Sequence, residues 1–412
     1  MNKNYSTKKI LSLLLTLAML LSTTACGRTD DTPQTSGQSQ ADASSQDPEA
    51  SLTGGASQNT ETFLPDASQD PEASVPGDAS QTPGTSASHS VPASSEPAPG
   101  AEQPEYEVQY PVTLTDQAGR EVTLASQPKR LVSGYYISTS LLIALNLEDN
   151  IVGIEAKADS RPIYRFSAPA LLDLPNVGSA KEFDLEGCAA LEPDLVILPI
   201  KLKSAAKTLT ELGFPVLLVN PENQEMLTEM IHLIAKATNT EAQAQALLDF
   251  TAAQEERLSG LLGTANAPTV YLAGNSSLLS TAGNAMYQSD LIRRAGGINA
   301  AAEITDTYWA EIDYERLLHW NPDYIILASD AAYTVEDVLT DPNLADCAAV
   351  AEGNVYQMPG KAESWDSPVP GSILGIVWLS GILHPDLCPE TDNEAIINEY
   401  YENFYGFLYS EN

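Results

Sequence analysis

One stretch of helix-forming residues, TNTEAQAQALLDFTAAQEERLSGLLG at residues 238–263, limits what this chain can fold into. Thr238 and Glu241 have the spacing of a capping box, which marks the start of a helix. Leucine and phenylalanine then recur at helical spacing, and Gly263 and Pro268 mark the end. A helix of about 24 residues spans roughly 36 Å, the diameter of a small domain. The stretch therefore predicts a helix long enough to bridge two lobes.

The segments on either side of this helix share one pattern. Residues 184–198 and residues 313–327 both read D-x-E, six further residues, P-D, three apolar residues and Leu. Each copy predicts a short helix, a Pro-Asp turn and a buried strand. Such corners are common in α/β proteins, so two unrelated corners are the alternative. The identical offsets favour an internal duplication with one copy in each of two similar lobes.

The rest of the folded part, from about residue 106 onward, alternates between strand and helix patterns. This alternation predicts parallel pairing with helices on both faces. We therefore expect an α/β fold of two similar lobes, each a mainly parallel sheet flanked by helices, joined by one long bridging helix. The expected divisions are an N-terminal lobe at 106–237, the bridging helix at 238–263 and a C-terminal lobe at 264–412. Expected local elements are a hairpin at 110–124, strands at 130–134, 151–154, 195–198, 216–219 and 269–273, helices at 139–147 and 205–212, and a terminal helix at 393–409.

The N-terminus has the features of an export signal at residues 1–25. Three lysines precede an apolar run that is too short to span a membrane comfortably, and small residues follow it. Cys26 comes directly after them, which resembles a bacterial lipoprotein signal with Cys26 as the lipidated first mature residue. Thr23 stands where that pattern usually has Leu. The alternative is ordinary signal cleavage beside an incidental cysteine.

Residues 26–105 are rich in Ser, Pro, Asp and Gln, and ASQDPEAS at 67–74 nearly repeats SSQDPEAS at 44–51. Such a composition buries too little apolar surface to offset the entropy of ordering. We expect this segment to be a disordered tether between the lipid anchor and the folded part.

Charge and cysteine usage narrow the function classes. A net charge of −36 and the lack of a basic patch in the sequence together exclude a nucleic-acid role. Beyond Cys26 the cysteines are Cys188, Cys347 and Cys388, whose number and spacing form no zinc or disulfide framework. A disulfide between Cys347 and Cys388 stays open. The four histidines are not spaced as a metal site, so we expect no bound metal and no intrinsic cofactor.

The order of several motifs resembles the substrate-binding proteins of iron-complex and cobalamin ABC importers. The motifs are PKRLVS at 128–133, NVG at 176–178 ahead of the first D-x-E, the bridging helix, and RAGGIN at 294–299. The tail, ESWDSP at 363–368 and ILGIVWL at 373–379, resembles one subset of that family. The resemblance covers residues 110–409 and implies two lobes on a rigid helix, with the ligand in the cleft between them.

By this resemblance the ligand is a metal chelate: a ferric siderophore, a cobalamin or other corrinoid, or haem, whose iron a tyrosine can ligate. In such sheets the ligand lies beyond the carboxyl ends of the strands, where flat aromatic rings supply apolar area. Arg161 and Arg165 are candidates to neutralise an anionic complex. For each residue the alternative is core packing or a solvated surface. The expected ligand-binding residues are Tyr135, Tyr136, Ser179, Lys181, Tyr287, Trp309, Trp365 and Asp366.

Glu186 and Glu315 occupy matching positions in the two copies of the repeat. In the family, a glutamate on each lobe faces arginines of the membrane permease and orients docking. The alternative is an ordinary carboxylate at the start of a helix. The resemblance implies an ABC permease with its ATPase as partners, a lipid anchor in the membrane on its extracytoplasmic face, and a monomer.

The sequence bears on two other function classes. An enzyme is disfavoured because the chain has no nucleophile elbow, HExxH motif, phosphate loop or histidine-rich constellation. A surface sensor or storage lipoprotein without a permease stays open. Among transport ligands the alternative is an oxyanion of the molybdate or tungstate type, which would need a small cleft lined by backbone and hydroxyl donors.

Overall fold

The computed structural model describes residues 107–411. The expected signal peptide, the lipidated Cys26 and the tether lie outside these residues. Within the described part of the chain, no helix is both long enough and apolar enough to cross a membrane.

An antiparallel hairpin opens the described chain. Its strands, β1 (Val112–Thr115) and β2 (Glu121–Leu124), bury alternate residues, as expected for strands with one face on a core. The buried Asp116 carboxylate accepts hydrogen bonds from the Arg120 side chain at 2.7 Å and from the Leu218 backbone at 3.0 Å. The sequence-predicted hairpin is confirmed, and Asp116 joins it to the sheet of the first lobe.

The N-terminal lobe is a parallel sheet of four strands in the order β4-β3-β5-β6. The central strand β5 (Leu195–Pro199) is buried along its whole length, as a strand covered on both faces must be. The other strands are β3 (Leu131–Ser133), β4 (Ile151–Ile154) and β6 (Val216–Val219). The helices of this lobe are α2 (Tyr136–Ala144), α3 (Pro162–Ser167), α4 (Leu185–Ala190), α5 (Lys203–Glu211) and α6 (Gln224–Thr238).

The C-terminal lobe has a mixed sheet in the order β10-β8-β7-β11-β12, with β9 also paired to β7. Strands β9 and β11 pair in parallel with β7, and β12 pairs in parallel with β11. At one edge of the sheet, β8 pairs antiparallel with β7, and β10 pairs antiparallel with β8. The strands are β7 (Thr269–Ala273), β8 (Ser280–Ala282), β9 (Ile298–Asn299), β10 (Trp309–Glu311), β11 (Tyr324–Leu327) and β12 (Val355–Gln357). The helices are α8 (Tyr287–Arg294), α9 (Tyr314–Trp320), α10 (Val335–Leu339), α11 (Ala348–Glu352), α12 (Ile373–Leu383) and α13 (Glu390–Tyr405).

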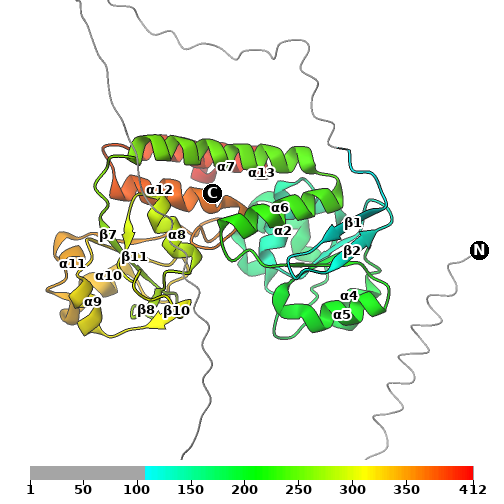
Figure 1. Ribbon diagram of the computed structural model, residues 1–412, viewed down its shortest axis with the longest axis horizontal. Helices are drawn as coiled ribbons and strands as arrows, with labels where there is room; N and C mark the ends of the chain where they lie inside the picture. Colours follow the sequence, from blue (N-terminus) through cyan, green and yellow to red (C-terminus); the bar gives the residue numbers. More distant parts are fainter. Residues whose placement is uncertain (1–106, 412) are drawn as a thin grey trace, which may run out of the picture. The chain divides into compact units, whose positions relative to one another are not determined.

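The long helix α7 (Glu241–Leu262) runs along one side of both lobes (Figure 1). Its predicted capping box is wrong. Thr238 is the last residue of α6, and its hydroxyl donates to the Ile234 carbonyl at 2.8 Å. Asn239 then takes a left-handed conformation, and Thr240 begins α7 without a side-chain cap. Thr238 therefore ends α6, whereas the sequence pattern had assigned it to the start of α7.

Helix α13 lies beside α7 and forms a second brace between the lobes (Figure 1). The rings of Phe250 in α7 and Tyr400 in α13 are 5.4 Å apart, and Phe407, just after α13, lies 5.4 Å from Phe166 of the N-terminal lobe. The Ile163 backbone NH also donates to the Ala362 carbonyl at 3.1 Å. One continuous hydrophobic cluster includes residues of both lobes, α7 and α13. The lobes are therefore joined by more than the single predicted helix.

The described cysteines, Cys188, Cys347 and Cys388, are all free and buried. The disulfide between Cys347 and Cys388 that the sequence left open is not formed. Within residues 107–411, no group of three or more His, Cys, Asp or Glu side chains is placed to hold a metal ion.

Candidate functional site

A cavity of about 350 Å³ lies between the two lobes. Its N-terminal wall comes from segments that follow β3 and β4, and its C-terminal wall from segments that follow β11 and β12. Ligands of α/β sheets bind beyond the carboxyl ends of the strands, so the position of this cavity is the expected one. The polar residues that line it are Tyr136, Ser140, Lys157, Ser160, Arg161, Tyr164, Asp330, Glu363 and Ser364.

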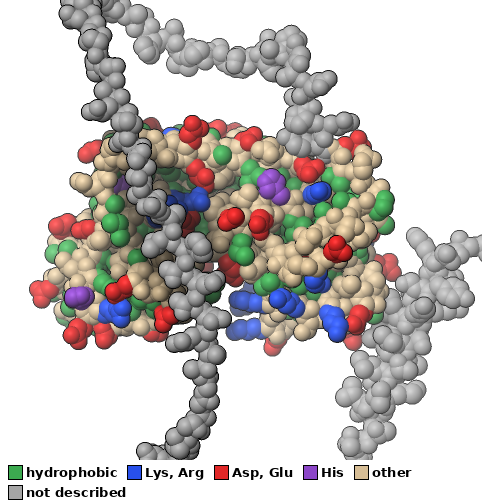
Figure 2. All heavy atoms as spheres, in the orientation of Figure 1, with side chains coloured by type: hydrophobic (Ala, Val, Ile, Leu, Met, Phe, Trp, Pro, Cys, Tyr) green, Lys and Arg blue, Asp and Glu red, His purple; other side chains and the backbone are tan. Residues whose placement is uncertain are grey.

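The N-terminal wall carries two cationic side chains. The Arg161 guanidinium lies over the Tyr136 ring, 4.1 Å from its centroid, a cation–π geometry that fixes the side chain. Lys157 has a left-handed backbone (φ 67°) at the turn after β4. On the visible face of the molecule, Lys and Arg side chains gather on the N-terminal lobe where it borders the other lobe (Figure 2). This wall is suited to an anionic ligand.

The buried carboxyl group of Glu155 supports the N-terminal wall through hydrogen bonds. Glu155 accepts hydrogen bonds from the Tyr164 hydroxyl at 2.6 Å and from the Thr139 hydroxyl at 2.7 Å. Burial raises the pKa of Glu155, and these two hydrogen bonds oppose that rise. The network joins α2, the end of β4 and α3, so it holds the cavity-lining Tyr164 in place.

Glu363 links the two lobes at the cavity. Its Oε2 accepts a hydrogen bond from the Ser140 hydroxyl of α2 at 2.9 Å, and that hydroxyl also lies 2.9 Å from the Tyr405 hydroxyl of α13. Oε1 faces the backbone of Gly371, where a Cβ atom would come within 2.3 Å of it. Glu363 is 8% exposed, and burial raises its pKa to about 7.

Asp366, which the sequence proposed as a ligand contact, organises the C-terminal wall. Its carboxylate accepts from the Ser329 backbone NH at 3.2 Å and from the Ser329 hydroxyl at 2.7 Å. The nearby Ser364 hydroxyl donates to Asp330 at 3.1 Å. Asp366 is buried, and burial raises its pKa despite these hydrogen bonds. Asp366 thus positions the loop after β11 from inside the lobe.

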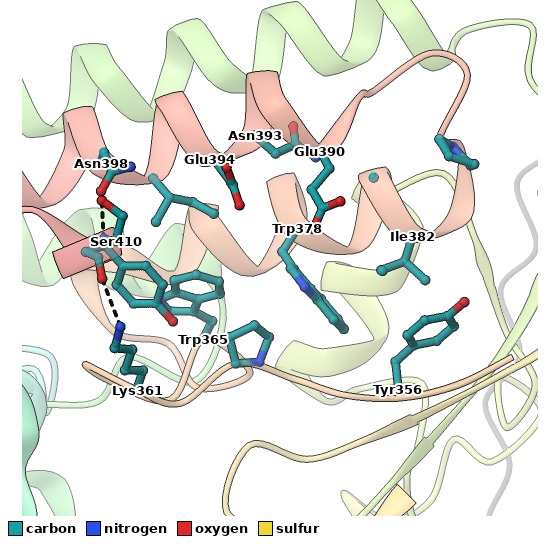
Figure 3. A pocket seen from close by; sticks show the side chains of 15 residues that line it. Tyr356, Lys361, Trp365, Trp378, Ile382, Glu390, Asn393, Glu394, Asn398 and Ser410 are labelled. Carbon is teal, nitrogen blue, oxygen red and sulfur yellow. Dashed lines mark hydrogen bonds between the residues drawn. The ribbon is translucent and has the colours of Figure 1, made fainter. Parts of the chain in front are cut away.

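Two of the proposed aromatic contacts are core residues. Trp365 is 1% exposed, and its ring NH donates to the Tyr401 hydroxyl at 2.8 Å. One edge of Trp365 borders a second cavity of about 710 Å³, which lies wholly within the C-terminal lobe and is also lined by Trp378 (Figure 3). Tyr287 is likewise buried, at 4% exposure. Neither ring lines the inter-lobe cavity.

The remaining proposed contacts lie at the edges of the lobes. Trp309 is 40% exposed on the edge strand β10, and its ring covers Gly274, directly after β7. Tyr135 packs edge-on against Tyr136, with ring centroids 5.3 Å apart. Lys181 is exposed, and the Ser179 hydroxyl accepts from its backbone NH at 3.3 Å in a turn. These residues do not line the inter-lobe cavity; of the proposed ligand contacts, Tyr136 does, and the candidate Arg161 lies beside it.

Arg165, the other cationic candidate, points elsewhere: it is exposed, and its guanidinium donates to the Asp159 carbonyl at 3.2 Å. The sequence analysis missed Lys157, Ser160, Asp330 and Ser364. Lys157 and Asp330 each follow the end of a predicted strand by three residues. A search for polar residues just after each predicted strand would therefore have found both.

The proposed docking residues occupy equivalent positions in the two lobes. Glu186 is exposed in the first turn of α4, and Glu315 is exposed in the first turn of α9. The preceding Asp184 and Asp313 each cap their helix, accepting a backbone NH at 2.8 Å. Figure 1 shows α4 and α9 on the side of each lobe away from α7. Both glutamates therefore lie in the first turn of a helix that an aspartate caps.

Comparison with known proteins identifies the family to which this fold belongs. A sequence model of the family described as "Periplasmic binding protein" matches residues 131–362. The chain is 26% identical over 323 residues to the molybdate-binding protein MolA of Haemophilus influenzae, covering 72% of this chain and 91% of MolA. The solved structure of MolA bound to molybdate superposes with a TM-score of 0.65, covering 72% of this chain and 99% of that one.

Two further relatives are more distant. An uncharacterised ABC transporter substrate-binding lipoprotein, YvrC of Bacillus subtilis, is 25% identical, covering 68% of this chain and 88% of YvrC. A cobalamin-binding protein of Halobacterium salinarum is 24% identical, covering 60% of this chain and 67% of its own length. The family model spans more than half of the chain and includes most residues of the inter-lobe cavity, whereas Glu363 and Ser364 lie just beyond its end. The chain therefore belongs to the periplasmic binding protein family and is a substrate-binding protein of the ABC-transporter type.

Proposed function

We propose that this protein is the lipid-anchored, extracytoplasmic substrate-binding component of an ABC importer, and that it binds a compact oxyanion of the molybdate or tungstate class between its lobes. It delivers this ligand to a permease and performs no chemistry. The observation that carries the proposal is the small inter-lobe cavity with Lys157 and Arg161 in one wall.

The size of the cavity favours a compact ligand. Its volume of about 350 Å³ is at the low end of the range of roughly 300–1,000 Å³ that is typical of ligand pockets. A tetrahedral oxyanion fits with some of its water, whereas a corrinoid or haem requires the lobes to move apart. The two bracing helices and the hydrogen bond between Ile163 and Ala362 oppose such a movement.

The charge of the cavity favours an anion when Glu363 is protonated. Lys157 and Arg161 then face a single carboxylate, that of Asp330. Ser160 and Ser364 also line the cavity, and their hydroxyls donate to the Lys157 carbonyl and to Asp330. Each hydroxyl would have to turn away from that partner to donate to the oxygens of the ligand. The structure of MolA with molybdate supports the same ligand class, since it covers nearly all of the folded part of this chain.

A metal chelate is the second candidate, and one observation favours it. Trp309 and Tyr308 are 40% and 57% exposed on the C-terminal lobe, a large aromatic surface left in contact with solvent. Flat rings of this kind stack on a ferric siderophore, a corrinoid or haem. The relative in Halobacterium salinarum is named as a cobalamin-binding protein. This candidate requires a cleft wider than the cavity described here.

Isothermal titration of the purified protein distinguishes the two ligand classes. Molybdate and tungstate should bind, whereas a ferric catecholate and cyanocobalamin should not. Arg161→Gln should weaken oxyanion binding at least tenfold, because it removes a charge from the cavity wall. Arg165→Gln is the matched control, since Arg165 lies outside the cavity, and it should bind as the wild type does. Tight binding of a chelate with no response to either oxyanion would overturn the proposal in favour of the second candidate.

The anchor and the partners complete the proposal. Cys26 would hold the protein at the membrane, and the B. subtilis relative carries the name lipoprotein. Glu186 and Glu315 would dock onto a permease with its ATPase, and the protein would act as a monomer. Uptake of the ligand by cells separates this role from that of a sensor or storage lipoprotein, because deletion of the gene for a sensor or store leaves the initial uptake rate unchanged.

A further inference from the structure

The Glu363 carboxyl group occupies an unusual place for an acidic side chain. It is buried between the lobes, lines the ligand cavity, and receives one hydrogen bond from the other lobe through Ser140. No Lys, Arg or His within the described residues forms an ion pair with it. Its Oε1 has no aligned donor, although it faces the Gly371 backbone. An ionised Glu363 would therefore be a nearly uncompensated buried charge.

We infer that Glu363 couples anion binding to proton uptake: the cavity accepts an anion when this carboxyl group is protonated and repels it when the group is ionised. This inference rests on the proposed function, since it concerns the same cavity. It adds a regulatory property to that site and identifies the responsible residue.

The groups around Glu363 are consistent with this assignment. From α2 it faces Ser140, and its charge acts on Tyr136 of the same helix and on Tyr400, Tyr401 and Tyr405 of α13. All four tyrosines have raised pKa values, so they stay neutral across the physiological range. Among Glu363, Ser140 and these four tyrosines, Glu363 is therefore the group that changes charge near neutral pH.

The other charged groups are in the cavity or close to it. Arg161 and Lys157 are in the N-terminal wall and Asp330 is in the C-terminal wall, while the buried Asp366 also acts on Tyr136. Burial raises the pKa of Glu363 to about 7, whereas Ser140 and the Gly371 backbone oppose that rise. A bound anion would raise the pKa of Glu363 further, because it disfavours a second negative charge nearby.

The direction of the effect follows from linkage. When the bound protein holds the proton more tightly than the free protein, binding takes up protons. Affinity is then constant below the pKa of the free protein and falls by up to tenfold per pH unit above it. Loss of affinity should begin near pH 7, where Glu363 ionises in the free protein.

The test is titration with molybdate from about pH 6 to about pH 9 in buffers of different ionisation enthalpy, a range in which free molybdate does not titrate. The wild type should take up as much as about one proton per anion, and its affinity should fall with rising pH. Glu363→Gln keeps the shape of the side chain and an acceptor for Ser140, and it should bind with little pH dependence and retain affinity at high pH. Asp330→Asn removes an exposed carboxylate from the same cavity, so it should shift the affinity by a similar factor at every pH.

The outcomes separate the two proposals. If molybdate does not bind at any pH, the proposed ligand is wrong and the proton coupling is wrong with it. If molybdate binds without proton uptake, or if Glu363→Gln keeps the wild-type pH dependence, the coupling alone is overturned. The proton count needs only the wild type, so an absence of proton uptake overturns the coupling even if the variant fails to fold.

Discussion

Ser140 of the N-terminal lobe donates a hydrogen bond of 2.9 Å to Glu363 of the C-terminal lobe. The same serine hydroxyl lies 2.9 Å from the Tyr405 hydroxyl, so the contact joins α2, the segment after β12 and α13. Because Glu363 also lines the ligand cavity, a single carboxyl group contributes to both the contact between the lobes and the charge of the site. Its protonation should therefore affect stability as well as binding.

The first prediction concerns stability against pH. The pKa of Glu363 is raised from 4.5 to about 7 in the folded protein, so the unfolded chain loses this proton at lower pH than the folded protein does. The contribution of Glu363 to the free energy of unfolding should be largest below about pH 4.5 and should be lost by about pH 7, a change of roughly 3 kcal/mol from this group. Glu155 and Asp366 also have raised pKa values and contribute in the same direction.

Urea denaturation at a series of pH values measures this effect. Glu363→Gln should lose less stability than the wild type as the pH rises from about 4.5 to about 7, because the amide does not titrate. The buried Glu155 and Asp366 leave some dependence in the variant. Superimposable pH profiles for the two proteins would show that Glu363 is solvated in the native state.

The second prediction compares two tryptophans. Trp365→Ala should destabilise the protein by roughly 3–5 kcal/mol, because the ring is fully buried and its NH bonds to Tyr401. Trp309→Ala is the matched control on an exposed edge strand and should change stability by less than about 1 kcal/mol. Thermal denaturation measures both. A Trp365→Ala protein with unchanged stability and weakened ligand binding would place this ring in the ligand site instead.

The contrast between these tryptophans shows what the sequence could predict. The bridging helix, the hairpin and the strands at 151–154 and 216–219 follow from local patterns, and each is found at or within a few residues of its expected place. Burial of Trp365 depends on Tyr401 and Tyr409, which approach it from the C-terminal segment of the chain. No local pattern around ESWDSP contains that information.

The site residues were hard to predict for a similar reason. The sequence selected aromatic residues for stacking, but the cavity is defined by groups such as Lys157 and Ser364, which turns and loops bring together. The sequence placed Glu363 only at the start of the ESWDSP motif and predicted no role for its side chain. Its role depends on Ser140, which lies 223 residues earlier in the chain. Contacts of that range depend on the packing of the two lobes.

The third prediction concerns movement of the lobes. Bending α7 would break backbone hydrogen bonds. Helix α13 also forms hydrogen bonds with both lobes, between Tyr405 and Ser140 and between Tyr401 and Trp365. Closure on the ligand should therefore be a tilt of a few degrees. Spin labels on Glu186→Cys and Glu315→Cys should report similar distances with and without ligand. A large contraction on adding ligand would show that these braces open.

The fourth prediction concerns the membrane anchor. Cys26→Ser should release the protein from membranes, because it removes the sulfur that would carry the lipid. The folded part should be unaffected, since residues 107–411 form their own core. Fractionation of cells into membrane and soluble pools measures the release, and ligand titration of the released protein controls for folding. Equal membrane retention of the variant would contradict lipidation at Cys26.

The fifth prediction concerns docking on the permease. Glu186 and Glu315 are exposed in the first turns of α4 and α9, and neither lines the inter-lobe cavity. The double variant Glu186→Arg and Glu315→Arg should abolish uptake, because two carboxylates that attract arginines become two repelling charges. Ligand affinity should change less than about twofold, since both sites lie outside the cavity. Each single reversal should lower uptake less than the pair, because one attractive contact remains. A purified double variant that no longer binds ligand would show that these residues act in the binding site, and normal uptake would show that the permease docks elsewhere.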